Sequence, residues 1–60
     1  MDEYVFVVTY SNFMTSENRS ESIHVWSDSE RKAFDRALEE AYCNIKKEEG
    51  LSKIELLYVI

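Results

Sequence analysis

Two stretches of the sequence, EYVFVVTY (Glu3–Tyr10) and KIELLYVI (Lys53–Ile60), read as β-strands that are apolar on both faces. Both are rich in β-branched and aromatic residues, which favour strands, and successive side chains of a strand point to opposite faces. An antiparallel sheet with one face in water normally alternates apolar with polar side chains. Because the 60-residue chain has only one helix-forming segment, the second face needs another cover.

The segment between these strands predicts the remaining elements. SIHVW (Ser22–Trp26) alternates as a shorter strand, and the polar segment Ser11–Ser22 connects it to the first strand. SDSE (Ser27–Glu30) fits a capping box at the start of a helix, and Gly50 can take the left-handed conformation that ends one. The sequence therefore predicts a helix of about 22 residues, roughly 33 Å long.

The predicted helix is amphipathic, and its apolar face should cover the sheet. At 100° per residue, this face contains Phe34, Leu38, Ala41 and Ile45, widened by Ala37 and Tyr42. The elements follow the order β-β-α-β, and a right-handed crossover puts the first strand in the centre. We expect a single α+β domain, residues 1–60, with a three-stranded antiparallel sheet of order 2-1-3 and one long helix packed on one face.

Strand periodicity assigns the remaining apolar residues to the uncovered face. In the last strand it puts Ile54, Leu56, Tyr58 and Ile60 on one side, under the helix. The candidate apolar interface on the other side consists of Val5, Val7, Trp26, Leu57 and Val59. Left in water, these side chains would form a patch of roughly several hundred Å², near the limit that monomers tolerate.

Three occupants could cover this face. A second copy could stack sheet on sheet or pair edge to edge, and we expect such a homodimer because two-fold dimers are the commonest assembly. A small domain with a single cysteine, Cys43, also lacks the disulfides that often stabilise such chains. Alternatively, the Ser11–Ser22 connection could fold Phe13 and Met14 under the sheet. A different partner protein could also bind the face directly.

The net charge of −5 is concentrated in the first half of the chain. Residues 1–30 carry six acidic side chains and one arginine, whereas residues 31–60 are balanced. The topology would bring Asp2, Glu3, Asp28 and Glu30 to one end of the molecule, with Glu17 and Glu21 at the other. This charge argues against direct binding to nucleic acid or to an anionic membrane and favours a basic protein partner. Alternatively, the acids serve only helix capping and solubility.

The sequence offers little that could carry chemistry. No sequence spacing indicates an orienting carboxylate or a nucleophile for His24. Cys43 is predicted to be an exposed thiol without a catalytic role. No cluster has metal-ligand spacing and one glycine cannot form a phosphate loop. We therefore expect no enzyme activity, no metal and no cofactor. The longest apolar run is too short to span a bilayer and no signal peptide is legible, so we expect a cytoplasmic protein.

In its small size, acidity, lack of proline and β-β-α-β order, the chain resembles the small acidic early proteins of bacteriophages of Gram-positive hosts. Some of these inhibitors of host machinery mimic DNA, including an inhibitor of the histone-like protein HU. The resemblance implies a non-enzymatic inhibitor in the host cytoplasm and assigns no residue. We expect an acidic homodimer that occupies the nucleic-acid-binding surface of a basic host protein. The alternatives are an interaction module that binds through the exposed sheet face, and a structural or assembly subunit.

Overall fold

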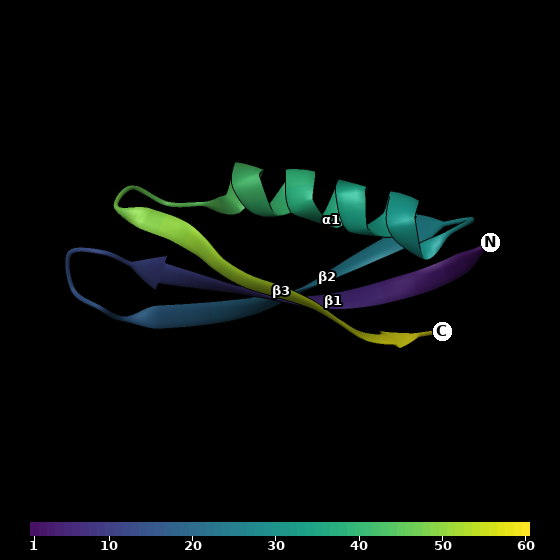
Figure 1. The fold of residues 1–60 in the computed structure, drawn as a ribbon, viewed down its shortest axis with the longest axis horizontal. Coiled ribbons are helices and arrows are strands. Elements are labelled where there is room, and N and C mark those ends of the chain that lie inside the picture. Colours follow the sequence, from purple (N-terminus) through teal and green to yellow (C-terminus); the bar gives the residue numbers. More distant parts are fainter.

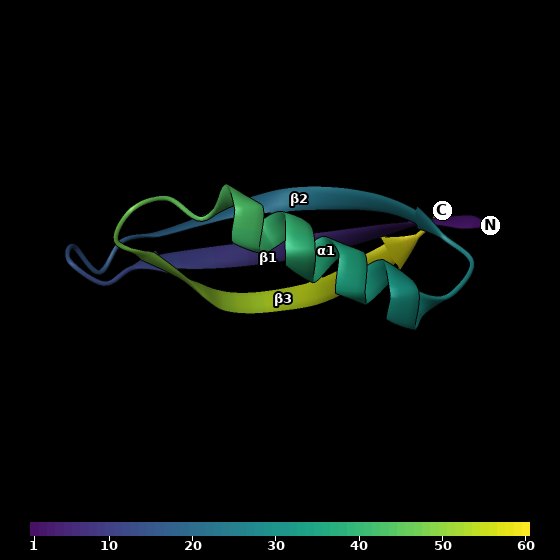
Figure 2. The same ribbon diagram turned by 90° about the horizontal axis from the view of Figure 1, so that it is seen from above.

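The computed structural model describes residues Met1–Ile60 and contains three strands and one helix. The elements are β1 (Asp2–Asn12), β2 (Asn18–Ser27), α1 (Glu30–Asn44) and β3 (Glu49–Val59). The strands form one antiparallel sheet in the order β2-β1-β3. The helix α1 crosses one face of this sheet diagonally, and both termini lie at the same end of the molecule (Figures 1 and 2). The predicted α+β fold and strand order are confirmed.

The core lies between α1 and the side chains of β1 that alternate toward it. Tyr4, Phe6, Val8 and Tyr10 of β1 are buried there, together with Ile23 and Val25 of β2. The helix meets them with Ala33, Ala37 and Ala41, all fully buried and spaced four residues apart. Residues four apart lie on the same helix face, and small side chains on that face let the helix approach the sheet closely.

The buried stripe of α1 differs from the predicted one. The prediction omitted Ala33 and placed Phe34 and Tyr42 within the stripe, but Tyr42 is 60% exposed. Phe34 lies at the margin, where its ring and that of Phe6 pack edge to face with their centroids 6.1 Å apart. Ala37 and Ala41 were predicted to lie on this face, and Ala33 extends it by one turn because its small side chain fits against the sheet.

The helix is also shorter than predicted, with 15 residues. Its N-cap is Ser29, whose side chain accepts from the Lys32 N–H, whereas the predicted cap Ser27 is a buried residue at the end of β2. The predicted stop at Gly50 is wrong because the left-handed conformation is taken by Glu48, at φ 71°. Gly50 already belongs to β3.

The connection between β1 and β2 is a short turn rather than the predicted long segment. Both strands extend further than expected, and the turn over residues 13–17 is held by the Asn12 side chain, which accepts from the N–H groups of Met14 and Thr15. Phe13 is 71% exposed at this hairpin tip, and Met14 is exposed beside it. The structure therefore excludes the alternative in which these two side chains fold under the sheet.

Two irregularities in β3 change which of its residues face the helix. The pairing with β1 skips one residue of β3 at Leu57 and another at Ser52, and an extra residue of this kind reverses the alternation that follows. Tyr58 therefore stands opposite Val5, on the face away from α1, and Val59 stands opposite Tyr4, on the helix side. The predicted faces of Tyr58 and Val59 are corrected by this shift.

The correction extends to the end of the chain. Ile60 was predicted to lie in the core, but it is exposed and its backbone pairs with that of Glu3, with its N–H donating to the Glu3 carbonyl at 2.8 Å. Glu3 lies on the face away from α1, so Ile60 belongs to the same side of the sheet. Of the residues assigned to the core from the last strand, Ile54 and Leu56 do pack against it.

Candidate functional site

The side of the sheet away from α1, here called the open face, carries no covering element (Figure 1). The strand register assigns to it Glu3, Val5, Val7 and Thr9 of β1, Ser20, Ser22, His24 and Trp26 of β2, and Lys53, Glu55 and Tyr58 of β3. The half near the termini is mainly apolar, and the half near the hairpin tip is polar. The open face is thus less uniformly apolar than the sequence suggested.

The apolar half, here called the terminal patch, consists of Val5, Val7, Trp26, Tyr58 and Ile60. Trp26 is 57% exposed, and Tyr58 and Ile60 are similarly exposed. Val5 is only 2% exposed, because it sits on the central strand with His24 and Tyr58 opposite it on either side. Val5 therefore forms the floor of the patch, while the aromatic and aliphatic side chains around it are available for contact.

A histidine–carboxylate pair borders the terminal patch. His24 Nδ1 lies 2.9 Å from Glu3 Oε2 on the open face. Trp26 stands directly opposite Glu3 in the register, so the indole and this carboxylate are cross-strand neighbours. The orienting carboxylate that the sequence did not reveal is present, but the pair sits on an exposed, flat surface.

Four of the predicted acidic residues lie at one end of the molecule, here called the acidic end: Asp2, Glu3, Asp28 and Glu30. Asp2 stands opposite Ser27 in the register, so the start of β1 lies beside the turn that carries Asp28 and Glu30. Asp28 accepts from Lys32 at 3.3 Å, and this hydrogen bond holds the pKa of Asp28 below its ordinary value. Neither Asp2 nor Glu30 has an ion-pair partner.

The remaining predicted acids lie far from this end and differ from each other. Glu17 is exposed at the hairpin tip. Glu21 is half-buried, accepts from the Tyr10 hydroxyl and accepts from Asn44 Nδ2 at 3.0 Å. Its carboxylate is therefore engaged within the fold, and we leave Glu21 out of the candidate binding surface.

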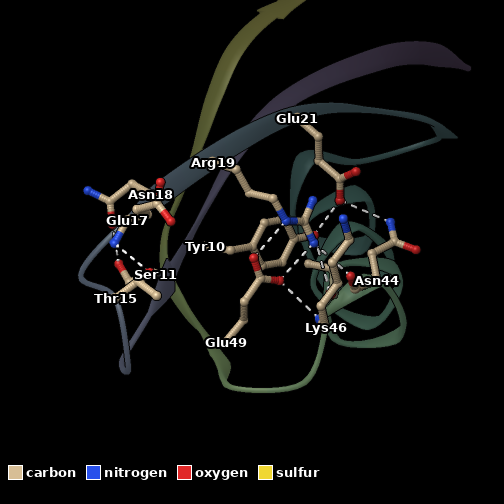
Figure 3. Close-up of polar contacts among 11 residues, drawn as sticks. Tyr10, Ser11, Thr15, Glu17, Asn18, Arg19, Glu21, Asn44, Lys46 and Glu49 are labelled. Atoms are coloured by element: carbon tan, nitrogen blue, oxygen red, sulfur yellow. Dashed lines mark hydrogen bonds and ion pairs between the residues drawn. The ribbon is translucent and has the colours of Figure 1, made fainter.

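Glu21 belongs to a polar cluster between β2, the end of α1 and the start of β3 (Figure 3). Arg19 makes two bonds to the Glu49 carboxylate, at 2.8 and 2.9 Å, and donates to the Asn44 carbonyl at 2.9 Å. Its guanidinium also stacks 4.2 Å from the centre of the Tyr10 ring. Arg19 thus holds the Asn44 carbonyl, at the last residue of α1, against the sheet.

Each acid of this cluster is stabilised in its charged form. The hydrogen bond from Arg19 lowers the pKa of Glu49, and the hydrogen bond from Tyr10 lowers the pKa of Glu21. Burial, followed by the contact with Glu21, raises the pKa of Tyr10 to about 12. Sequence reasoning missed this cluster, although one signal was available, since Arg19 is the only basic residue in the first half of the chain.

A tyrosine titration tests the cluster. We expect one phenol to ionise near pH 12, well above the ordinary 10.0, in an absorbance titration. Because folding raises the pKa of Tyr10, the contribution of this group to the free energy of unfolding is complete below pH 10 and is lost as the pH rises through 12. Tyr10→Phe should abolish this late step, whereas Tyr42→Phe, on the exposed side of α1, should retain it. Retention of the late step in Tyr10→Phe would contradict the assignment.

Comparisons with protein-family models, curated proteins and solved structures find no match to this chain. The resemblance to phage inhibitors therefore stays a prediction. The helix α1 is not long and apolar enough to cross a membrane. The structure has no pocket and no group of three side chains that could hold a metal, and Cys43 is a free, exposed thiol.

Proposed function

We propose that the protein is a non-enzymatic binding protein that acts as a homodimer and inhibits a basic protein by occupying its nucleic-acid-binding surface. The observation that supports this proposal most is that Trp26 of the terminal patch and the Glu3 carboxylate of the acidic end are cross-strand neighbours on the open face. Asp2 precedes Glu3 along β1, so its side chain lies at the same end of the molecule but on the side of the sheet toward α1, like that of Ser27 opposite it. Exposed aromatic anchors supply most of the affinity in many protein interfaces, and carboxylates beside them would favour a basic partner.

The charges at the acidic end define what kind of partner fits. Lys32 pairs with Asp28, and Arg36 donates to the Trp26 carbonyl at 3.0 Å, so positive charge lies within the acidic end. The array is therefore weaker than a run of phosphates, and charge alone does not account for binding. A partner must offer an apolar site for Trp26 and Tyr58 on the open face and basic side chains that reach Asp2 and Glu30 around the end of the sheet.

A second function is favoured by the terminal patch taken alone. Trp26, Tyr58 and Ile60 are exposed whatever the charge around them, and such a patch can bind a protein of any charge. The protein would then be an interaction module or an assembly subunit, and its binding would depend little on salt.

Binding to purified HU, used as a probe for basic DNA-binding proteins, separates the two functions. We expect calorimetry to show binding that weakens as salt is raised, and anisotropy to show displacement of a labelled duplex from HU. The double variant Asp2→Asn/Glu30→Gln should weaken binding by about 1 kcal/mol, or about fivefold, because two exposed charges are lost.

The matched control removes two carboxylates from the exposed side of α1. Glu39→Gln/Glu40→Gln changes the net charge by the same amount, and both residues are exposed. It should bind like the wild type. Equal effects of the two double variants would show that only net charge matters. HU bound without salt dependence or duplex displacement would instead favour the interaction module, and failure to bind HU would contradict the proposal.

A further inference from the structure

The strand β3 has a free edge that runs the length of the molecule. It pairs only with β1, at the outside of the sheet, and is 11 residues long. The chain contains no proline, so no residue of β3 lacks a backbone donor. An exposed edge of this kind is a template for pairing with another chain, and charge, proline or bulges limit where such pairing can occur. The two irregularities at Ser52 and Leu57 restrict regular pairing to the segment between them, Lys53–Leu56.

The charges in this segment are arranged for pairing with a second copy. Lys53 and Glu55 flank Ile54, and both lie on the open face, opposite Thr9 and Val7. In the single chain their side chains pair with each other at 3.2 Å. Side chains directly opposite across an antiparallel pair interact, favourably for opposite charges and unfavourably for like charges.

Symmetry limits the registers that such a pair can adopt. A two-fold axis perpendicular to the sheet keeps each side chain on its own face of the sheet. Residues directly opposite in an antiparallel pair share a face, so one residue must lie opposite its own copy at the centre of the pair. Centring on Lys53 places two lysines opposite each other, and centring on Glu55 places two glutamates opposite each other. Centring on Ile54 places Lys53 opposite the partner's Glu55 and Glu55 opposite the partner's Lys53. Centring on Leu56 places Glu55 opposite the partner's Leu57, at the irregularity. Of these four registers, only the one centred on Ile54 pairs opposite charges.

We propose that two copies of this chain pair antiparallel through β3, centred on Ile54, to form one continuous sheet. Ile54 packs against the core on the helix side, so it would meet the partner's Ile54 on that side while the charged pairs form on the open face. This inference takes from the proposed function only the existence of a homodimer, and it adds the way in which the two chains pair. The terminal patches stay free, and both lie on the same continuous open face.

Charge-reversal variants test this register in the absence of any partner protein. By sedimentation velocity, we expect the wild type to dimerise, and Lys53→Glu and Glu55→Lys each to raise the dimer dissociation constant about tenfold or more, since each opposes like charges twice. The double variant Lys53→Glu/Glu55→Lys should dimerise again. A mixture of the two single variants should form a heterodimer, because every cross-strand pair in it has opposite charges.

The heterodimer separates pairing between chains from any effect within one chain. Both side chains are exposed, so circular dichroism should show that every variant is folded. A monomeric wild type at about 100 μM, far above a micromolar dissociation constant, would overturn the inference. So would single variants that dimerise like the wild type while Trp26→Lys does not, because the open face would then be the dimer interface. Binding to HU is measured separately, so a failure of this dimer and a failure of the proposed target are distinguished.

Discussion

Phe6→Ala is expected to lower the free energy of unfolding by about 3–5 kcal/mol, the usual range for removal of a buried phenylalanine ring. Phe6 is 1% exposed on the central strand, and its ring packs edge to face with that of Phe34. A hydrophobic core in a chain of this size rarely supplies more than about 3–5 kcal/mol in total. The variant should therefore be mostly unfolded at 25 °C, as far-UV circular dichroism with a urea titration would show.

The chain contains its own control for this change. Phe13→Ala removes the same ring from the exposed hairpin tip, where surface substitutions usually change stability by less than about 0.5 kcal/mol. A folded Phe6→Ala protein with the urea midpoint of the wild type would show that the core is not centred on this ring. The packing of α1 over β1 would then have to be reconsidered.

The fold was predictable because its signals are local. The β-branched and aromatic residues of Glu3–Tyr10 and the serine-rich start of the helix define the elements, and the element order then leaves few topologies. The end of the helix was not predictable in this way. At the last residue of α1, Arg19 binds the Asn44 carbonyl from a strand 25 residues earlier in the chain, and no local sequence pattern predicts that contact.

The candidate site was predictable only in part. Chain topology alone indicated that Asp2 and Glu3 would lie near the β2–α1 turn, and the register agrees. The predicted faces of Tyr58 and Val59 were wrong because no glycine or proline marks the irregularity at Leu57 in the sequence. A prediction from simple alternation assumes that KIELLYVI contains no extra residue. The extra residue at Leu57 places Tyr58 on the open face instead of the core side.

Trp26→Ala should have the largest effect on binding to HU. Truncation of an aromatic anchor commonly costs at least about 2 kcal/mol, or about 30-fold in affinity. The substitution should leave the fold intact, because Trp26 is 57% exposed on the open face. Tyr42→Ala is the matched control, since it removes a similarly exposed aromatic side chain from α1. A Trp26→Ala protein that binds HU as tightly as the wild type would exclude the terminal patch from the interface.

Chemical-shift mapping of the isotope-labelled protein with unlabelled HU tests the central claim most directly. The account predicts that the largest changes fall on the terminal patch and the adjoining acidic end, at Asp2, Trp26, Tyr58 and Ile60. Changes confined to the hairpin tip at Phe13, or to the exposed side of α1, would contradict it.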